Sequence, residues 1–147
     1  MALDVAKGFV PALLATIFVG QLAGVLAGGA AMLEHWRPLF MGFKRGGKVV
    51  ATCGGAFLGV ARVVGGIGAA VWILVFAVCR YGSVASIAAA LSLPVTAVAL
   101  GEPWPVGVFA GIAALAVLVL HCANIALLRS GTETRFRFRR GAEPVKS

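Results

Sequence analysis

Apolar residues follow one another in long runs along this chain, and short polar segments separate the runs. The first run extends from Gly8 to Leu33, and Gln21 is its only strongly polar member. Because a helix crosses a bilayer with about 20 residues, this run is too long for one upright helix. We expect a break at Gly20 and Gln21, with a first element that ends there and a second that returns and ends near His35.

Further apolar segments follow, each ended by polar or turn-forming residues. They are Val49–Ala61, Val63–Cys79, Val84–Leu100 and Trp104–Leu120. With the first run, they predict an all-α, multi-pass integral membrane helical bundle with about five or six membrane elements. We expect this domain to cover residues 1–128, and a basic tail to cover residues 129–147.

Composition supports the membrane assignment. Hydrophobic residues make up 61% of the chain and charged residues 12%, whereas soluble domains are about half apolar and a quarter charged. No polar stretch is long enough for a separate soluble domain. Cys53, Cys79 and Cys122 stand singly, which favours buried thiols over a metal site or a disulfide. We expect no metal and no cofactor.

Basic residues mark one side of the predicted bundle. They occur at Lys44, Arg45 and Lys48, at Arg80, and in the tail, with about two apolar elements between neighbouring groups. Helical hairpins would bring all three groups to one face, which the positive-inside rule makes cytoplasmic. This pattern indicates the inner (plasma) membrane and contacts with anionic lipid rather than with nucleic acid. Arg62 falls at the opposite face, where it could snorkel to the interface.

Polar side chains from three loops should therefore meet at the cytoplasmic face. Backbone N–H groups of a glycine turn and a lysine ammonium group are what a phosphate needs, and serine, histidine and asparagine could orient a hydroxyl-bearing substrate. The spacing does not match a nucleotide P-loop. Alternatively, each residue only caps a helix or sets topology. The candidates are His35, Gly46, Gly47 and Lys48 in the first loop, Ser83 and Ser86 in the second, and His121, Asn124 and Glu133 in the third.

Four segments of the chain resemble, in order, the motifs of one family. They are LDVAKGFVPALLA, HWRPLFMGFKRGGKVVAT, YGSVASIAAALSLP and HCANIALLRSGTETRF. The family that they resemble is that of the bacterial acyl-phosphate:glycerol-3-phosphate acyltransferases (PlsY family). The resemblance implies transfer of an acyl group from acyl phosphate to the 1-hydroxyl of glycerol 3-phosphate, which yields lysophosphatidate and phosphate for phospholipid synthesis. It also implies that neither a metal nor an acid/base residue is used.

Roles for individual residues are implied by the same resemblance. Lys48 would bind phosphate beside Gly46 and Gly47, whereas Ser86, His121 and Asn124 would arrange glycerol 3-phosphate. His35 and Glu133 match motif positions without a clear role. The chain also departs from the family, since Glu34 and Val49 stand where the family has glycine, and Cys122 and Leu127 where it usually has arginine.

The family opens with a further transmembrane helix and a glycine- and asparagine-containing loop, which would precede Asp4. We therefore expect an N-terminally truncated member that is weakly active or inactive in this form. Two alternatives remain, a non-catalytic membrane remnant and a small transporter of an anionic solute. The transporter predicts polar residues at mid-span, and this sequence has almost none. Acyl-chain preference and oligomeric state do not follow from the sequence.

Overall fold

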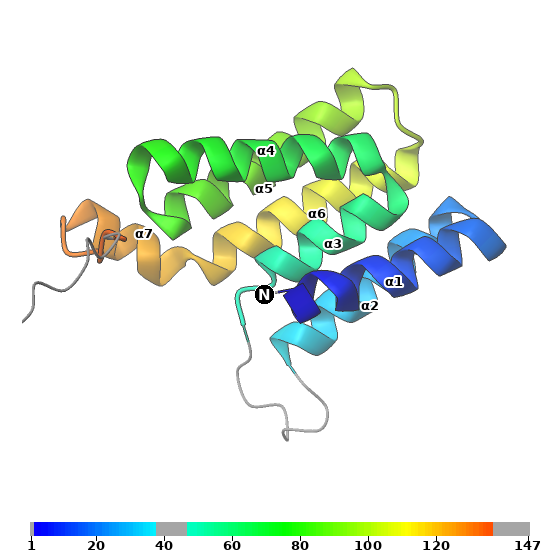
Figure 1. Cartoon of the computed structure of the whole chain (residues 1–147), viewed down its shortest axis with the longest axis horizontal. Helices are drawn as coiled ribbons and strands as arrows, with labels where there is room; N and C mark the ends of the chain where they lie inside the picture. The colour runs from blue at the N-terminus through cyan, green and yellow to red at the C-terminus, as the bar shows by residue number, and fades with distance from the viewer. Residues whose placement is uncertain (1, 38–46, 137–147) are drawn as a thin grey trace, which may run out of the picture.

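The computed structural model describes residues 2–37 and 47–136, and this part of the chain contains seven helices and no strand (Figure 1). The prediction of an all-α bundle is confirmed. The helices are α1 (Ala2–Phe18), α2 (Gln21–Trp36), α3 (Val50–Val60), α4 (Arg62–Cys79), α5 (Gly82–Ala99), α6 (Trp104–Leu120) and α7 (Cys122–Arg129). The first six correspond to the six apolar elements expected from the sequence.

The first apolar run forms a helical hairpin. α1 ends at Phe18, α2 begins at Gln21, and the two helices lie side by side (Figure 1). Gly20 has a φ of 126°, a backbone conformation that residues with a side chain rarely adopt. The break predicted at Gly20 and Gln21 is therefore confirmed, and its cause is a turn that glycine permits.

The short helix α3 lies at the centre of the bundle and packs against α1, α2, α4 and α6. Most of its side chains are buried, and the ring of Phe57 stacks on Phe109 of α6 with 4.8 Å between centroids. A turn at Ala61 separates α3 from α4. α3 thus contributes the core and, at its first residue, reaches the end of the bundle where the polar loops meet.

Glycine residues let α1 approach α3 closely. A Cβ added at Gly8 would overlap the carbonyl oxygen of Thr52, and one at Gly55 would overlap the carbonyl oxygen of Val5. Such contacts between small residues are a common means of holding helices together in a bilayer. Gly65 and Gly68 of α4 have the same role, because a Cβ there would collide with α3 and α5 respectively, whereas a Cβ on Gly66 would meet nothing within 4 Å.

The later helices carry the most apolar surface. α4 and α5, with 18 residues each, are long and apolar enough to cross a membrane, and α6 with α7 makes a third if this pair, bent by 55°, is one broken span. Val78 and Val98, for example, expose more than 70% of their surface. Outward-facing apolar side chains on such helices are suited to lipid, which supports the multi-pass membrane assignment.

The polar loops are sorted to one end of the bundle. The α4–α5 turn and the α6–α7 bend lie at the left of Figure 1, and the end of α2 and the start of α3 are the left-hand ends of these two helices. Residues from these segments line one cleft, so the prediction that three separate polar segments converge is confirmed. Lys44, Arg45 and Gly46, which belonged to the first predicted loop, lie outside the described residues.

The α1–α3 contact predicts that alanine substitutions at two neighbouring glycines differ sharply in their effect on stability. Gly55→Ala should destabilise the bundle by about 1–3 kcal/mol, because its Cβ would collide with the backbone of α1. Gly54→Ala is the matched control, because its Cβ would meet nothing within 4 Å and alanine favours a helix. Unfolding of the purified protein in detergent measures both, and equal stabilities of the two variants would contradict the close contact.

Candidate functional site

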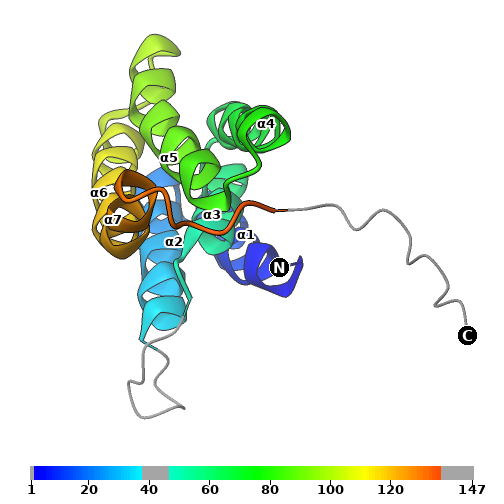
Figure 2. The same ribbon diagram turned by 90° about the vertical axis from the view of Figure 1, so that its left-hand side faces the viewer.

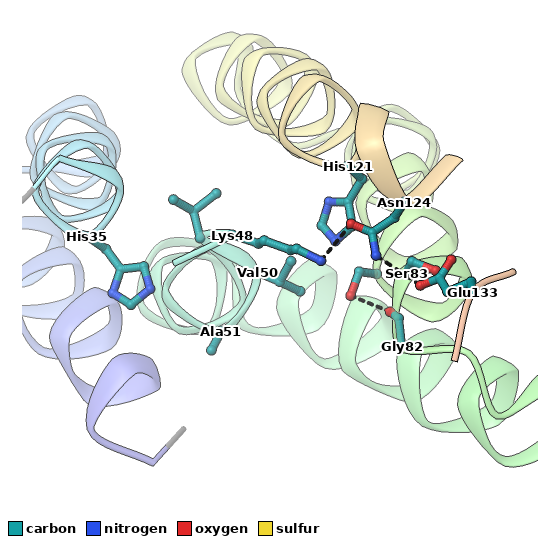
Figure 3. A pocket seen from close by; sticks show the side chains of 11 residues that line it. His35, Lys48, Val50, Ala51, Gly82, Ser83, His121, Asn124 and Glu133 are labelled. Atoms are coloured by element: carbon teal, nitrogen blue, oxygen red, sulfur yellow. Dashed lines mark hydrogen bonds between the residues drawn. The ribbon is translucent and has the colours of Figure 1, made fainter. Parts of the chain in front are cut away.

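A polar cleft of about 340 Å³ opens at the end of the bundle where the loops meet (Figure 3). It draws residues from α2, from the segment before α3, from α5, from the α6–α7 bend and α7, and from the segment after α7. Most of the residues predicted from the sequence line it. These are His35, Lys48, Ser83, Ser86, His121, Asn124 and Glu133.

Lys48 is joined to the far side of the cleft by a chain of hydrogen bonds. Its Nζ donates to Oδ1 of Asn124 at 2.7 Å, and Nδ2 of Asn124 donates to Oε1 of Glu133 at 2.9 Å (Figure 3). An ammonium group has three N–H donors, so Lys48 keeps two for another acceptor. These hydrogen bonds therefore hold one positive charge at a defined place and leave two N–H donors of Lys48 available.

The backbone beside Lys48 is constrained as well. Val49 is buried and has a φ of 55°, in the left-handed region that glycine prefers and where a β-branched residue is strained. Such strain costs about 1–3 kcal/mol and occurs mostly where the surrounding structure requires it. Here it turns the chain directly into α3 and leaves Lys48 in the cleft.

His121 lies past the end of α6 and only 2% of its surface is exposed. Its Nδ1 is 2.8 Å from the carbonyl oxygen of Val117, so Nδ1 carries the proton and Nε2 is left as an acceptor. Burial lowers the pKa of His121, which outweighs the hydrogen bond to Val117, and the Lys48 ammonium lowers it further. The neutral imidazole is thus favoured, with its lone pair free for a hydroxyl group.

The two serines of α5 differ in what they can bind. Oγ of Ser86 donates to the carbonyl oxygen of Gly82 at 2.7 Å and accepts from Nε1 of Trp72 at 3.2 Å. Ser83 also lines the cleft, and its Oγ is buried and has no hydrogen-bond partner among the described residues. Of the two hydroxyl groups, that of Ser83 is therefore the one without a protein partner. The sequence shows both serines in one motif, but only the contacts separate them.

His35 and Gly47 form the opposite wall. A Cβ on Gly47 would overlap Nε2 of His35, so the imidazole occupies the space beside this glycine. Nδ1 of His35 is 3.7 Å from the Asp4 carboxylate, and Lys7 is 3.5 Å from Glu34. These pairs join α1 to α2 and fix the wall against which the segment with Lys48 rests.

An apolar groove of about 740 Å³ lies between α2 and α6 next to the polar cleft. Val49 lines both cavities, and Trp36 and Leu120 line the groove near the cleft. The groove continues along the two helices to Leu22 and Trp104 near the other end. The polar cleft and the apolar groove thus have Val49 as a common lining residue.

No group of three or more His, Cys, Asp or Glu side chains in the described ranges could hold a metal ion. The cleft instead offers a cation, unpaired donors, a serine hydroxyl and a neutral imidazole. Together these groups suit a phosphate monoester that also carries a hydroxyl group. The fold and the site define a helical membrane protein with a polar cleft that holds a lysine, beside an apolar groove.

Comparisons with known proteins identify the family. Residues 1–131 match the model of the glycerol-3-phosphate acyltransferase family. The glycerol-3-phosphate acyltransferase of Roseiflexus sp. (strain RS-1) is 43% identical over 90% of this chain and 68% of the relative. That of Rhodospirillum rubrum is 40% identical over 98% of this chain and 69% of the relative. The chain belongs to the glycerol-3-phosphate acyltransferase family.

Two solved structures have the same fold. Both are crystal structures of PlsY, an integral membrane glycerol 3-phosphate acyltransferase, one in a glycerol 3-phosphate form and one in a lysophosphatidic acid form. Each is 36% identical to this chain and superposes with a TM-score of 0.88 over 92% of it. The match covers 68% and 70% of those chains, so this chain spans about two thirds of their length.

Proposed function

We propose that this chain is a glycerol-3-phosphate acyltransferase that forms lysophosphatidate in the polar cleft, with acyl phosphate as the acyl donor. The observation that carries the proposal is Lys48, held by Asn124 with two donors to spare, beside the unpaired hydroxyl of Ser83. The relatives' names and the ligands in the titles of the two similar structures support the choice of acceptor and product.

The acceptor would bind through both of its polar ends. The phosphate of glycerol 3-phosphate would take the free donors of Lys48 and backbone N–H groups near Gly47, as anions do at such sites. Ser83 would donate to or accept from a glycerol hydroxyl, and Nε2 of His121 would accept a hydrogen bond from the 1-hydroxyl. Both ends are then held, which orients the 1-hydroxyl oxygen towards the donor.

The reaction itself needs little acid/base help. The 1-hydroxyl oxygen forms a bond to the acyl carbonyl carbon, the bond from that carbon to the phosphate oxygen breaks, and the hydroxyl proton leaves with inorganic phosphate. An acyl phosphate is already activated, so positioning and stabilisation of the developing charge by Lys48 can supply the catalysis. This agrees with a site that offers a cation and hydrogen-bond donors.

The acyl chain would lie in the groove between α2 and α6. The groove is lined almost entirely by apolar side chains and meets the cleft at Val49. Lipid tails are as apolar as the side chains of the groove, so an acyl chain could pass from the bilayer into the groove at little cost. Its length along two helices would set the range of chain lengths accepted.

The cleft would face the cytoplasm in the plasma membrane. Arg80, Arg129 and Arg135 lie in segments at the same end as Lys48, whereas Arg62 follows the turn at the opposite end (Figure 1). An excess of lysine and arginine marks the cytoplasmic side of membrane proteins. The water-soluble acceptor would then enter from the cytoplasm. The acylated product would leave into the bilayer.

The first test is turnover by the purified protein in detergent. We expect weak phosphate release from palmitoyl phosphate that depends on glycerol 3-phosphate, with lysophosphatidate as the second product. Lys48→Met should lower kcat/KM by about tenfold to a hundredfold, the effect of losing a hydrogen bond to a charged group. Arg62→Met also removes one positive charge, but at the end of the bundle opposite the cleft, and should leave kcat/KM unchanged. A chain that neither binds glycerol 3-phosphate nor forms product would contradict the proposal and favour the non-catalytic remnant.

The two serines provide a second test. Ser83→Ala should raise KM for glycerol 3-phosphate by about twofold to tenfold, because it removes a hydroxyl that has no protein partner. Ser86→Ala should instead lower stability, since it leaves Nε1 of Trp72 without its acceptor, with KM within about twofold of the unchanged protein. Steady-state kinetics and unfolding in detergent separate the effects of the two variants. The reverse pattern would show that Ser86, and not Ser83, binds glycerol 3-phosphate.

Filling the groove should change the preferred donor. Ala116 of α6 lines the groove, so Ala116→Phe should shift the preference towards shorter acyl phosphates by several fold in kcat/KM. Val78→Phe adds an aromatic ring on the outer face of α4 and serves as the control. The measurement is kcat/KM across a series of acyl phosphates of different length. An unchanged preference in Ala116→Phe would show that the chain lies elsewhere.

A further inference from the structure

The segment after α7 runs back over the bundle instead of leaving it. Figure 2 shows this segment, which ends at Phe136, crossing in front of α3 and α5 towards α4. We call residues 133–136 the docking segment. Its first residue, Glu133, lines the polar cleft, and its last two residues contact the end of α4.

Backbone carbonyls of α4 hold the docking segment. The backbone N–H of Phe136 donates to the carbonyl oxygen of Arg80 at 2.9 Å, and Nε of Arg135 donates to the carbonyl oxygen of Cys79 at 3.2 Å. The last carbonyls of a helix have no partner within it, and a positive charge is favourable at that end. The docking segment thus caps α4 from a distant part of the sequence.

Aromatic contacts reinforce the attachment. The ring of Phe136 packs at a tilt on Phe76 with 5.6 Å between centroids, and Phe76 stacks on Trp72 at 5.0 Å. The Arg135 guanidinium lies 6.0 Å from the ring of Tyr81. Edge-to-face and cation–π contacts of this kind add to simple burial. Two consecutive side chains therefore fix the segment on the α4–α5 corner.

The attachment acts on the cleft through Glu133. Because a carboxylate only accepts hydrogen bonds, Glu133 makes Asn124 present its Nδ2 to Glu133 and its Oδ1 to Lys48. The Lys48 ammonium, which only donates, requires the same orientation of the amide, so Glu133 and Lys48 hold Asn124 from its two ends. Without Glu133 in place, the Nδ2 end of Asn124 loses its acceptor, and the side chain that anchors Lys48 is held at one end alone.

We propose that Arg135 and Phe136 are positioning residues, which by docking on the end of α4 hold Glu133 and Asn124 against Lys48 and so set the affinity of the cleft for phosphate. The proposal rests on the proposed function for the identity of the phosphate compound. Neither residue lines the cleft, so their effect on binding passes through Glu133.

The test combines a binding and a kinetic measurement on the full chain in detergent. The variant Arg135→Ala/Phe136→Ala should raise the Kd for inorganic phosphate, measured by calorimetry, and the KM for glycerol 3-phosphate by about tenfold. Its kcat should stay within about twofold. Arg135→Lys and Phe136→Leu keep a donor and an apolar side chain, and each should keep most of the affinity. Arg129→Ala removes one positive charge from the exposed end of α7 and is the matched control.

Each outcome decides the proposal. Unchanged phosphate affinity in the double variant would overturn it, as would an equal loss in Arg129→Ala, which would mean that basic charge alone matters. If the double variant does not fold, the single variants Arg135→Ala and Phe136→Ala are compared with Arg135→Lys and Phe136→Leu in the same way. A chain that binds phosphate but transfers no acyl group would contradict the proposed function, whereas the phosphate measurements would still test the docking.

Discussion

The close approach of α1 to α3 is the constraint on which the rest of the structure depends. Gly8 and Gly55 let the two backbones touch, and a methyl group at either position would overlap a carbonyl oxygen. Because α3 is short and buried on most sides, its position is set by this contact and by the stack of Phe57 on Phe109. The first residue of α3 follows Val49 directly, so the same packing determines where Lys48 lies.

Lys48 then joins parts of the chain that are far apart in sequence. Its hydrogen bond to Asn124 spans 76 residues, and the next bond reaches Glu133 in the segment after α7. One ammonium group in a cleft would otherwise be mobile, since a lysine side chain loses much conformational freedom when it is held in place. The hydrogen-bond chain provides that restraint and still leaves donors for a substrate. Preorganisation of this kind is what a reaction with an activated donor requires.

The cleft and the groove separate the polar from the apolar surface of the site. Polar groups from five segments meet at one end, and the groove between α2 and α6 carries the apolar surface away from them. Val49 lines both, and its left-handed backbone turns the chain between the segment with Lys48 and α3. A substrate that is a phosphate at one end and a hydrocarbon at the other would suit this division.

The sequence by itself determined the elements and most of the cleft. Apolar runs with Gly20 and other turn residues between them predict six of the helices, and the order of polar segments predicts that they share one end, because hairpins return the chain every second element. Seven of the nine candidate residues line the cleft. Gly47 lies beside it against His35, and Gly46 is outside the described residues.

Tertiary structure decided the rest. Ser83 and Ser86 share one motif and one helix. Only the folded neighbours show that the Ser86 hydroxyl is hydrogen-bonded to Gly82 and Trp72 while that of Ser83 has no partner among the described residues. The docking of Arg135 and Phe136 on α4 joins residues more than 50 positions apart, and no local pattern of hydrophobic or charged residues encodes a contact at that separation.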